Sequence, residues 1–143
     1  MGAKTTGFST SLLELIFGGT TIANLAENAS SSPATSLYLS LHTADPGVTG
    51  NQSTSEAAYT SYARVALPRN STGFSVAGGV MTLAEEAIFP EATGGSETET
   101  YFGIGTASSG TGTLLYRGTI TPSIVVSTGV TPELTTASTI TEI

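Results

Sequence analysis

The sequence predicts an all-β protein, a single β-sandwich or jelly-roll-like domain preceded by a short N-terminal helical segment. The polar positions are filled mainly by 26 threonines and 18 serines, residues that favour strands and turns respectively. Apolar runs follow one another at roughly ten-residue spacing and are separated by turns that contain Gly or Pro. No repeat of fixed period is visible, which excludes a solenoid or a propeller.

Length and composition are those of one domain that buries a core without disulfides. The chain has 143 residues, no cysteine and a formal net charge of −7. We expect residues 1–33 to form an N-terminal helical arm with its connector, and residues 34–143 to form the sandwich. The acidic balance argues against a nucleic-acid or membrane surface, and the apolar run at residues 12–17 is too short to span a bilayer.

The N-terminal arm is predicted to begin with an amphipathic helix. Ser9 or Thr10 is the expected N-cap, and Ser11 with Glu14 has the spacing of a capping box. The glycine pair at residues 18–19 ends or kinks this helix. A second helical piece is expected at residues 21–28, where apolar residues recur with helical spacing.

Two interpretations of the arm stay open. In the first, the helix packs across one end of the sandwich; in the second, the arm packs on a neighbouring subunit. Apolar groups near a chain end need a cover, so the arm is a candidate partner interface. The interface residues that we predict are Phe8, Leu12, Ile16, Phe17, Tyr38 and Tyr62. The two tyrosines lie opposite the apolar faces of their expected strands.

The organising stretch of the sandwich is predicted to be a pair of strands at residues 37–42 and 58–67. In the first strand Leu37, Leu39 and Leu41 alternate with Tyr38, Ser40 and His42, so the leucines face the core and the other three face solvent. A turn follows at residues 43–47, where Asp45 accepts bonds from the backbone ahead of it. Pro68 closes the second strand.

Short strands and turns continue to the C-terminus. Phe102 and Ile104 share one face of their strand and are the core candidates, and residues 108–112 form a hairpin loop. Ile140 or Thr141 faces inward in the last strand. Past Pro68 the expected strands, with glycine pairs or prolines at their ends, begin near residues 74, 80, 87, 101, 114, 124 and 138.

The candidate chemical groups favour structural roles. His42 is the sole histidine, so one chain cannot assemble a two-His or three-His metal site. His42 and Asp45 lack a Gly-x-Ser-x-Gly nucleophile, and we expect the histidine to bind the adjoining loop. Glu97 and Glu99 share a face, where a weak cation site or a solvated loop edge is expected. We predict no catalytic residue, cofactor or metal.

The order of segments resembles a family of small phage structural proteins that are often labelled tail fibre proteins. The matching segments, of which the Leu-His-Thr-Ala element is the most specific, are residues 11–19, 37–47, 62–65, 87–92, 102–104 and 114–118. The resemblance spans nearly the whole chain. It implies a virion component without known catalysis, assembled in the bacterial host cytoplasm.

Three functions are compatible with this resemblance. A fibre shaft needs length from repeats or a coiled coil, and neither pattern is present. We therefore expect a homo-oligomeric capsid decoration or cement protein that binds the major capsid protein shell and stabilises it. The alternative is a tail fibre or tail-adaptor subunit that binds other virion proteins in host attachment. A third is a carbohydrate-binding module that uses exposed tyrosines.

Two arginines are expected to need acidic partners, within the fold or across an interface. The chain has only four basic residues, and Arg64 and Arg117 lie inside predicted strands. We expect substitution of Arg64 to weaken folding more than assembly.

Overall fold

The computed structural model describes residues 3–23, 25–26 and 32–142. They fold as two compact units: one is built from the described parts of residues 1–36, 68–86 and 135–143, and the other from residues 37–67 and 87–134. The strands form antiparallel sheets, and one short helix lies near the N-terminus. The all-β class with an N-terminal helix is therefore confirmed, while the division at residue 33 stays a prediction.

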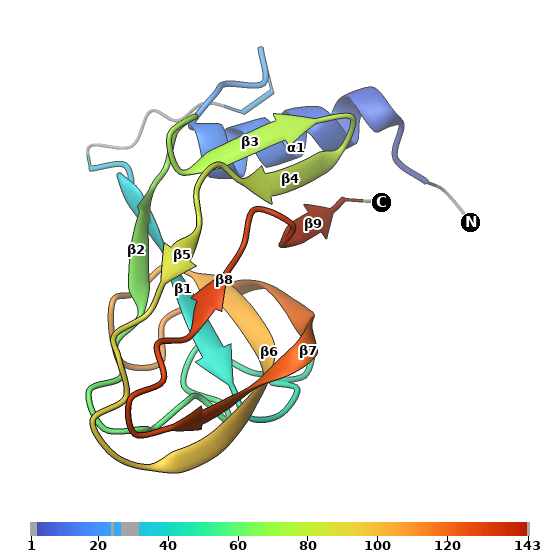
Figure 1. The fold of residues 1–143 in the computed structure, drawn as a ribbon. Helices are drawn as coiled ribbons and strands as arrows, with labels where there is room; N and C mark the ends of the chain where they lie inside the picture. The colour runs from blue at the N-terminus through green and yellow to red at the C-terminus, as the bar shows by residue number, and fades with distance from the viewer. Residues whose placement is uncertain (1–2, 24, 27–31, 143) are drawn as a thin grey trace. The chain divides into compact units, whose positions relative to one another are not determined.

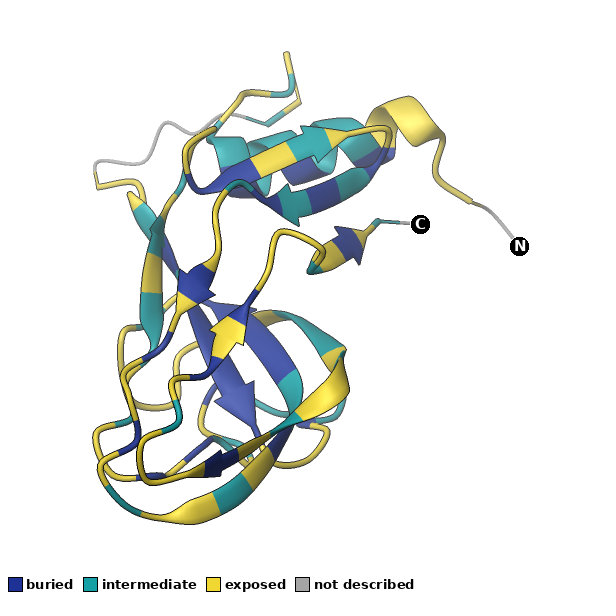
Figure 2. Ribbon diagram, in the orientation of Figure 1, coloured by how far each residue is buried: buried dark blue, intermediate teal, exposed yellow. Residues whose placement is uncertain are grey.

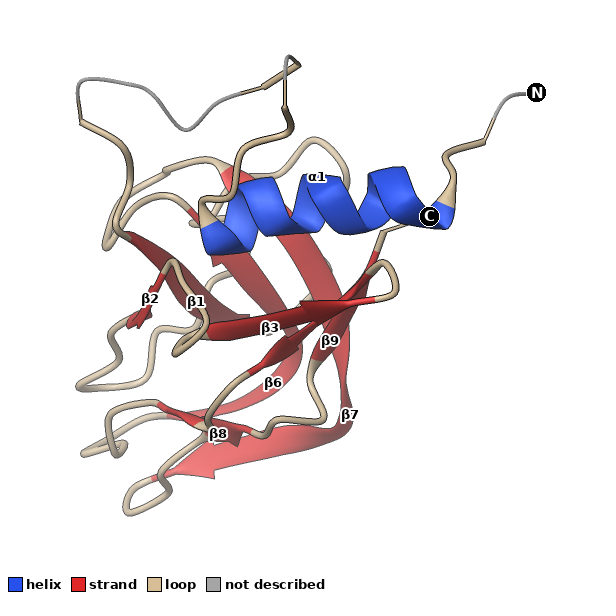
Figure 3. Cartoon of the chain, turned by 90° about the horizontal axis from the view of Figure 1, so that it is seen from above, coloured by secondary structure: helices blue, strands red, loops and turns tan. Residues whose placement is uncertain are grey.

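The first unit pairs the helix with a small sheet. Helix α1 (Thr6–Gly18) lies against the hairpin of β3 (Phe74–Ala77) and β4 (Val80–Leu83), and β9 (Thr139–Thr141) pairs with β4 (Figures 1 and 3). The Phe17 and Phe74 ring centroids are 4.9 Å apart. Buried side chains that complete this core are Leu13, Met81, Leu83 and Ile140.

Helix α1 begins earlier than the sequence predicted. Its N-cap is Thr5, whose hydroxyl accepts a hydrogen bond from the Phe8 N–H. The predicted caps at Ser9 and Thr10 are wrong, because Ser9 is buried within the helix and the Thr10 hydroxyl donates back to the Thr6 carbonyl. The expected end is confirmed, since Gly19 adopts a left-handed conformation with φ of 66°.

The predicted second helix is wrong in the described part of residues 21–28. Ile22 and Ala26 instead exchange two backbone hydrogen bonds that close a tight turn. A helix this short costs more to nucleate than it gains unless packing supports it, and Leu25 is 70% exposed.

The second unit contains most of the main sheet. Its strands are β1 (Ser36–His42), β2 (Val65–Pro68), β6 (Ser96–Gly105) and β7 (Leu114–Ser127), in the order β2-β1-β6-β7. A separate two-stranded pair joins β5 (Ala87–Ile88) to β8 (Glu133–Leu134). Figure 2 shows β1 and the adjoining part of β6 as the most continuously buried strands.

Strand β1 is buried on both faces, which corrects part of the sequence prediction. The three leucines point into the core as expected, and Phe102 and Ile104 are buried opposite them on β6. Ser40 and His42, which were expected to face solvent, are 0% exposed. The reason is that the loop after β1 folds back over this second face.

The long second strand predicted at residues 58–67 is wrong except for β2. Glu97 Oε1 accepts the backbone N–H groups of Ala58 and Tyr59, so these donors do not enter a ladder. Ser61 then adopts a positive φ of 81° and turns the chain. The turn at Ser61 brings together Tyr59 and Tyr62, which a strand would have placed on opposite faces; their ring centroids are 5.3 Å apart.

Several local turns are confirmed. The Asp45 carboxylate accepts the Gly47 N–H at 2.8 Å, and the pair Gly78-Gly79 closes a two-residue hairpin. Strands β6 and β7 are joined through the predicted hairpin loop. Strand β7 continues through Pro122, where the sequence predicted a break, because Pro122 lies at a register shift between β6 and β7 where no ladder pair needs an N–H from it.

Candidate functional site

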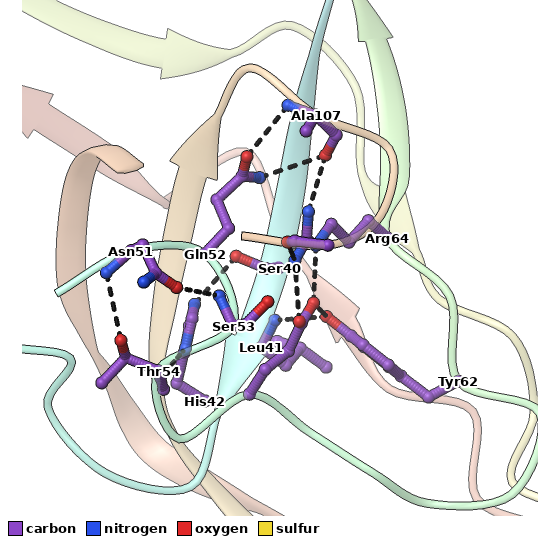
Figure 4. A network of polar contacts seen from close by, with 12 residues as sticks. Ser40, Leu41, His42, Asn51, Gln52, Ser53, Thr54, Tyr62, Arg64 and Ala107 are labelled. Carbon is purple, nitrogen blue, oxygen red and sulfur yellow. Dashed lines mark hydrogen bonds and ion pairs between the residues drawn. The ribbon is translucent and has the colours of Figure 1, made fainter. Parts of the chain in front are cut away.

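Two neighbouring loops of the second unit form the most elaborate polar arrangement in the described residues. We call these loops, residues 43–57 and 106–113, the loop platform. Figure 4 shows that side chains from β1, from the platform and from the stretch before β2 converge beneath it. The network determines how the platform is held, so it is the candidate functional site of this unit.

Arg64 is the central residue of this network. Its Nε and Nη2 atoms lie 2.6 and 2.7 Å from the two carboxylate oxygens of Glu56, a bidentate ion pair. Its other donors reach the backbone carbonyls of Ala107 at 2.8 Å and Gly110 at 2.6 Å. The side chain is only 2% exposed, and the hydrogen bonds to Glu56 raise the pKa of Arg64 further. One guanidinium therefore ties the two platform loops together.

Tyr62 links the ion pair to the sheet. Its hydroxyl donates to Glu56 at 3.0 Å and accepts the N–H of Leu41 in β1 at 3.1 Å. Its ring stacks on Phe89 with 6.3 Å between centroids. Burial raises the pKa of the Tyr62 hydroxyl, which keeps the proton it donates. Tyr62 thus fixes the carboxylate that holds Arg64.

Gln52 joins the same two loops a second time. Its side-chain amide donates to the Ala107 carbonyl at 3.3 Å and accepts the Ala107 N–H at 2.9 Å, while its own N–H bonds Thr111. Gly105 and Gly112 leave the room for it, because a Cβ at either position would overlap the Gln52 side chain. Gln52 is 0% exposed, so its hydrogen bonds compensate for its lost hydration.

His42 has the structural role that the sequence indicated. Nδ1 lies 2.9 Å from the Thr54 carbonyl and therefore carries the proton it donates. Nε2 accepts from the Ser40 hydroxyl at 2.8 Å. Burial lowers the pKa of His42, which favours this neutral form. Asp45 bonds Gly47 and Arg117 instead of His42, so the two do not form a catalytic pair.

Glu99 corrects the prediction of a solvated edge at Glu97 and Glu99. The Glu99 side chain is 0% exposed, and neither carboxyl oxygen has a hydrogen-bond partner among the described residues. Burial first, and the neighbouring Glu97 carboxylate second, raise the pKa of Glu99 to about 8. Glu99 is therefore largely protonated at neutral pH. The same two acids, after burial, raise the pKa of Tyr59 to about 12.

The predicted interface residues lie in different environments. In α1, Phe8 is 39% exposed, Leu12 and Ile16 are half-buried, and Phe17 is fully buried by its own unit. Tyr38 is half-buried on β1. Tyr62 is half-buried and belongs to the network below the platform. The interface itself stays a prediction, and Phe8 is its most accessible member.

The platform and the adjoining start of β7 carry exposed apolar groups that the sequence did not single out. Val48 is 91% exposed, and Leu115 at the start of β7 is 37% exposed. Both line a hollow of about 240 Å³ together with Tyr116 and Arg117. Exposed apolar side chains around a hollow are typical of protein contact surfaces.

The described residues offer little for metal or membrane chemistry. Among residues 3–23, 25–26 and 32–142, no group of three or more His, Asp or Glu side chains is placed to hold a metal ion. The described part of the chain also contains no helix long and apolar enough to cross a membrane. What the network can do is hold two loops in a fixed arrangement.

Two residues of the site, Glu56 and Gln52, were missed from the sequence, and the burial of Glu99 was not foreseen. The partnership of Arg64 with an acidic residue was expected and is confirmed, but Glu56 was not named, although it lies eight residues away. Gln52 was hidden in a polar loop; the only local hints were the glycines it needs, at positions 105 and 112. Nothing in the sequence near Glu99 indicated burial.

Arg64, with its ion pair to Glu56 and its bonds to both platform loops, forms what we call the Arg64 clamp. We predict that lysine replaces arginine poorly at position 64 but well at position 117. Arg64→Lys removes the bidentate pair and at least one carbonyl contact in a buried setting, and we expect it to lower the free energy of unfolding by about 2–4 kcal/mol. Arg117→Lys is the matched control, because the Arg117–Asp45 pair is 30% and 42% exposed and should cost about 0.5 kcal/mol or less. Urea denaturation measures both. Equal losses in the two variants would contradict the clamp.

The buried Glu99 predicts a defined pH dependence. Its folded pKa lies above that of the unfolded chain, so its contribution is fully present below about pH 4.5 and is lost as the pH rises toward 8. Between pH 5 and pH 7 the parent protein should therefore lose about 2 kcal/mol of unfolding free energy through Glu99. The Glu99→Gln variant, which does not titrate at this position, should not show this loss. Glu91→Gln, on an exposed loop, is the control and should show the same loss as the parent. A parallel pH profile for Glu99→Gln and the parent would refute the assignment.

Comparison with known proteins agrees with the resemblance seen in the sequence. No curated protein matches the chain. A family model described as Gp80, podophage GP4 fiber I protein gp80, matches residues 5–141 and so covers both units. A virion structural role follows from this match. The chain belongs to the Gp80 family of podophage fiber I proteins.

Proposed function

We propose that the chain is a non-enzymatic subunit of a phage tail fibre that works as a folded attachment module and assembles into a symmetric homo-oligomer. The observation that carries this proposal is the family match over residues 5–141, because that family is described as a podophage fiber protein. The fibre alternative is therefore preferred here over the capsid role that the sequence alone favoured.

The loop platform supports a binding role. Arg64 and Gln52 hold both loops from beneath, so the platform loses little conformational freedom when a partner binds. Val48 and Leu115 supply exposed apolar contact beside a hollow, and the Arg117–Asp45 pair adds a polar rim. We propose the platform as a contact surface for another virion protein, and Phe8, Leu12 and Ile16 of α1 as a second contact.

The absence of enzymatic activity is supported by the way the polar groups are used. Both ring nitrogens of His42 are occupied by Ser40 and Thr54. Two acids of this unit are not available for catalysis. The Glu56 carboxylate binds Arg64, and the Glu99 carboxyl group is enclosed without a hydrogen-bond partner among the described residues. A general base needs an accessible proton acceptor, and neither His42 nor Glu99 offers one.

A carbohydrate-binding role through the tyrosines has less support. Tyr59 is buried, and the other four tyrosines are half-buried. Flat aromatic faces open to solvent, which a sugar ring would stack on, are therefore absent from the described tyrosines.

The second candidate is a capsid decoration protein. Its support is the lack of shaft-forming structure: the longest helix in the described residues spans 13 residues, and the described strands vary in length from 2 to 14 residues without a repeating unit. A shaft of useful length needs heptads or a repeated β unit. Within the fibre proposal, the same observation favours a base or head module over a shaft.

Copy number and position separate the two candidates. Quantitative mass spectrometry of purified virions, with isotope-labelled peptides of this chain and of the major capsid protein, gives their ratio. We expect the copy number of this chain to be a small fraction of that of the capsid protein. We also expect gold-labelled antibody to bind to tails and not to tail-free heads, which serve as the control. A ratio near one, with label over the heads, would contradict the fibre role and establish capsid decoration.

A further inference from the structure

A polar groove in the first unit contains the Glu14 carboxylate, which has no ion-pair partner among the described residues. The groove has a volume of about 420 Å³ and lies where the C-terminal turn of α1 meets the edge of β3. Figure 3 shows the helix running beside this strand. Polar residues supply most of its lining, namely Glu14, Thr20, Asn70, Ser71 and Ser75.

The wall formed by β3 has free backbone hydrogen-bonding groups. Strand β3 is at the edge of the order β3-β4-β9. A two-residue hairpin places a hydrogen-bonded pair at Ala77 and Val80, so the next such pair is Ser75 with Thr82. The N–H and C=O of Val76 consequently point away from β4, and neither has a partner among the described residues. Such an edge can pair with an added strand.

The electrostatics of the groove favour a basic ligand. No hydrogen bond or ion pair engages the Glu14 carboxylate within the described part of the chain, and the other polar lining residues are neutral. A Cβ at Gly18 would come within 2.7 Å of Glu14 Oε2, so glycine there leaves room for the carboxylate beside the helix end.

The basic group must come from another protein. The chain has four Lys and Arg residues, and all are engaged: Lys4 with Glu142, Arg64 with Glu56, Arg117 with Asp45, and Arg69 with backbone carbonyls at the end of α1. None of these four side chains forms an ion pair with Glu14 in the described part of the chain, and Arg69 directs its donors to the carbonyls of Leu15 and Ile16 at the end of α1.

We propose that this groove binds an extended peptide segment of a partner protein, which adds as a strand to the free edge of β3 and places a Lys or Arg side chain on Glu14. Strand addition uses the outward N–H and C=O of Val76 for affinity, and Glu14 selects the basic side chain. A glycan fits less well, because the one aromatic ring at the groove, Phe74, is 3% exposed and offers no open face. The proposal holds whether the protein is on the tail or on the capsid.

The test uses an array of random, end-blocked octapeptides probed with the labelled full-length chain. We expect the captured peptides to contain Lys or Arg at one preferred position, and their binding to weaken roughly tenfold or more with Glu14→Gln. Glu85→Gln is the matched control, because Glu85 is exposed and does not line the groove. Capture without preference for a basic residue, or unchanged capture by Glu14→Gln, would overturn the proposal.

A second variant tests the strand edge separately from the charge. Val76→Pro removes an outward N–H, which an edge strand tolerates, and leaves the bonds to β4 in place. We expect it to retain its fold by circular dichroism and to lose peptide capture. If it unfolds, hydrogen exchange of the Val76 amide in the parent protein replaces it: slowing of that amide by a captured peptide supports strand addition. Unchanged exchange of the Val76 amide would refute strand addition. Failure to capture any peptide from the array would refute the peptide proposal. Binding to a glycan array that Glu14→Gln abolishes would also refute the peptide proposal.

Discussion

The ion pair between Arg64 and Glu56 is the interaction on which the second unit depends most. It is bidentate and buried, and its remaining donors are used on backbone carbonyls at Ala107 and Gly110. Buried pairs of this kind gain little net free energy over a hydrophobic substitute, but breaking one partner leaves a costly unpaired charge. The pair therefore acts mainly as a device for specificity: it allows one arrangement of two loops and penalises the others.

Most of the other buried polar side chains also pair backbone groups of the covering loops and of β1. The second unit covers one face of β1 with a loop, not with a second full sheet, so backbone groups that a sheet would pair need side-chain partners. His42, Gln52 and Tyr62 supply them from three different segments. Glu99 is the exception, since it is enclosed without a hydrogen bond from the described residues. Rigid loops of this kind would suit the proposed contact role, because loops that are already ordered lose little conformational entropy when a partner binds.

The sequence predicted the features that depend on neighbouring residues. The leucine alternation of β1, the turn at Asp45 and the strand break at residues 78–79 were all predicted, because each is determined within a few positions. The failures depend on distant contacts. Residues 58–64 alternate like a strand, yet Glu97, 38 and 39 positions away, takes their first two N–H groups. The need of Arg64 for an acidic partner was predictable from composition, whereas the burial of Ser40, His42 and Glu99 was not, because polar residues at alternating positions indicate a solvated face unless the covering loop is known.

Native-state hydrogen exchange of the platform amides is the most direct test of the central claim that one clamp orders both loops. The amides of Gln52 and Ala107 are bonded to Thr111 and to the Gln52 side chain, while that of Ala57 is bonded to Leu41. We predict that all three are protected in the parent protein, and that Glu56→Gln lowers the protection of Gln52 and Ala107 together while amides in β6 keep theirs. Loss at one loop with full protection at the other would contradict the account, because it would mean that the loops are ordered independently.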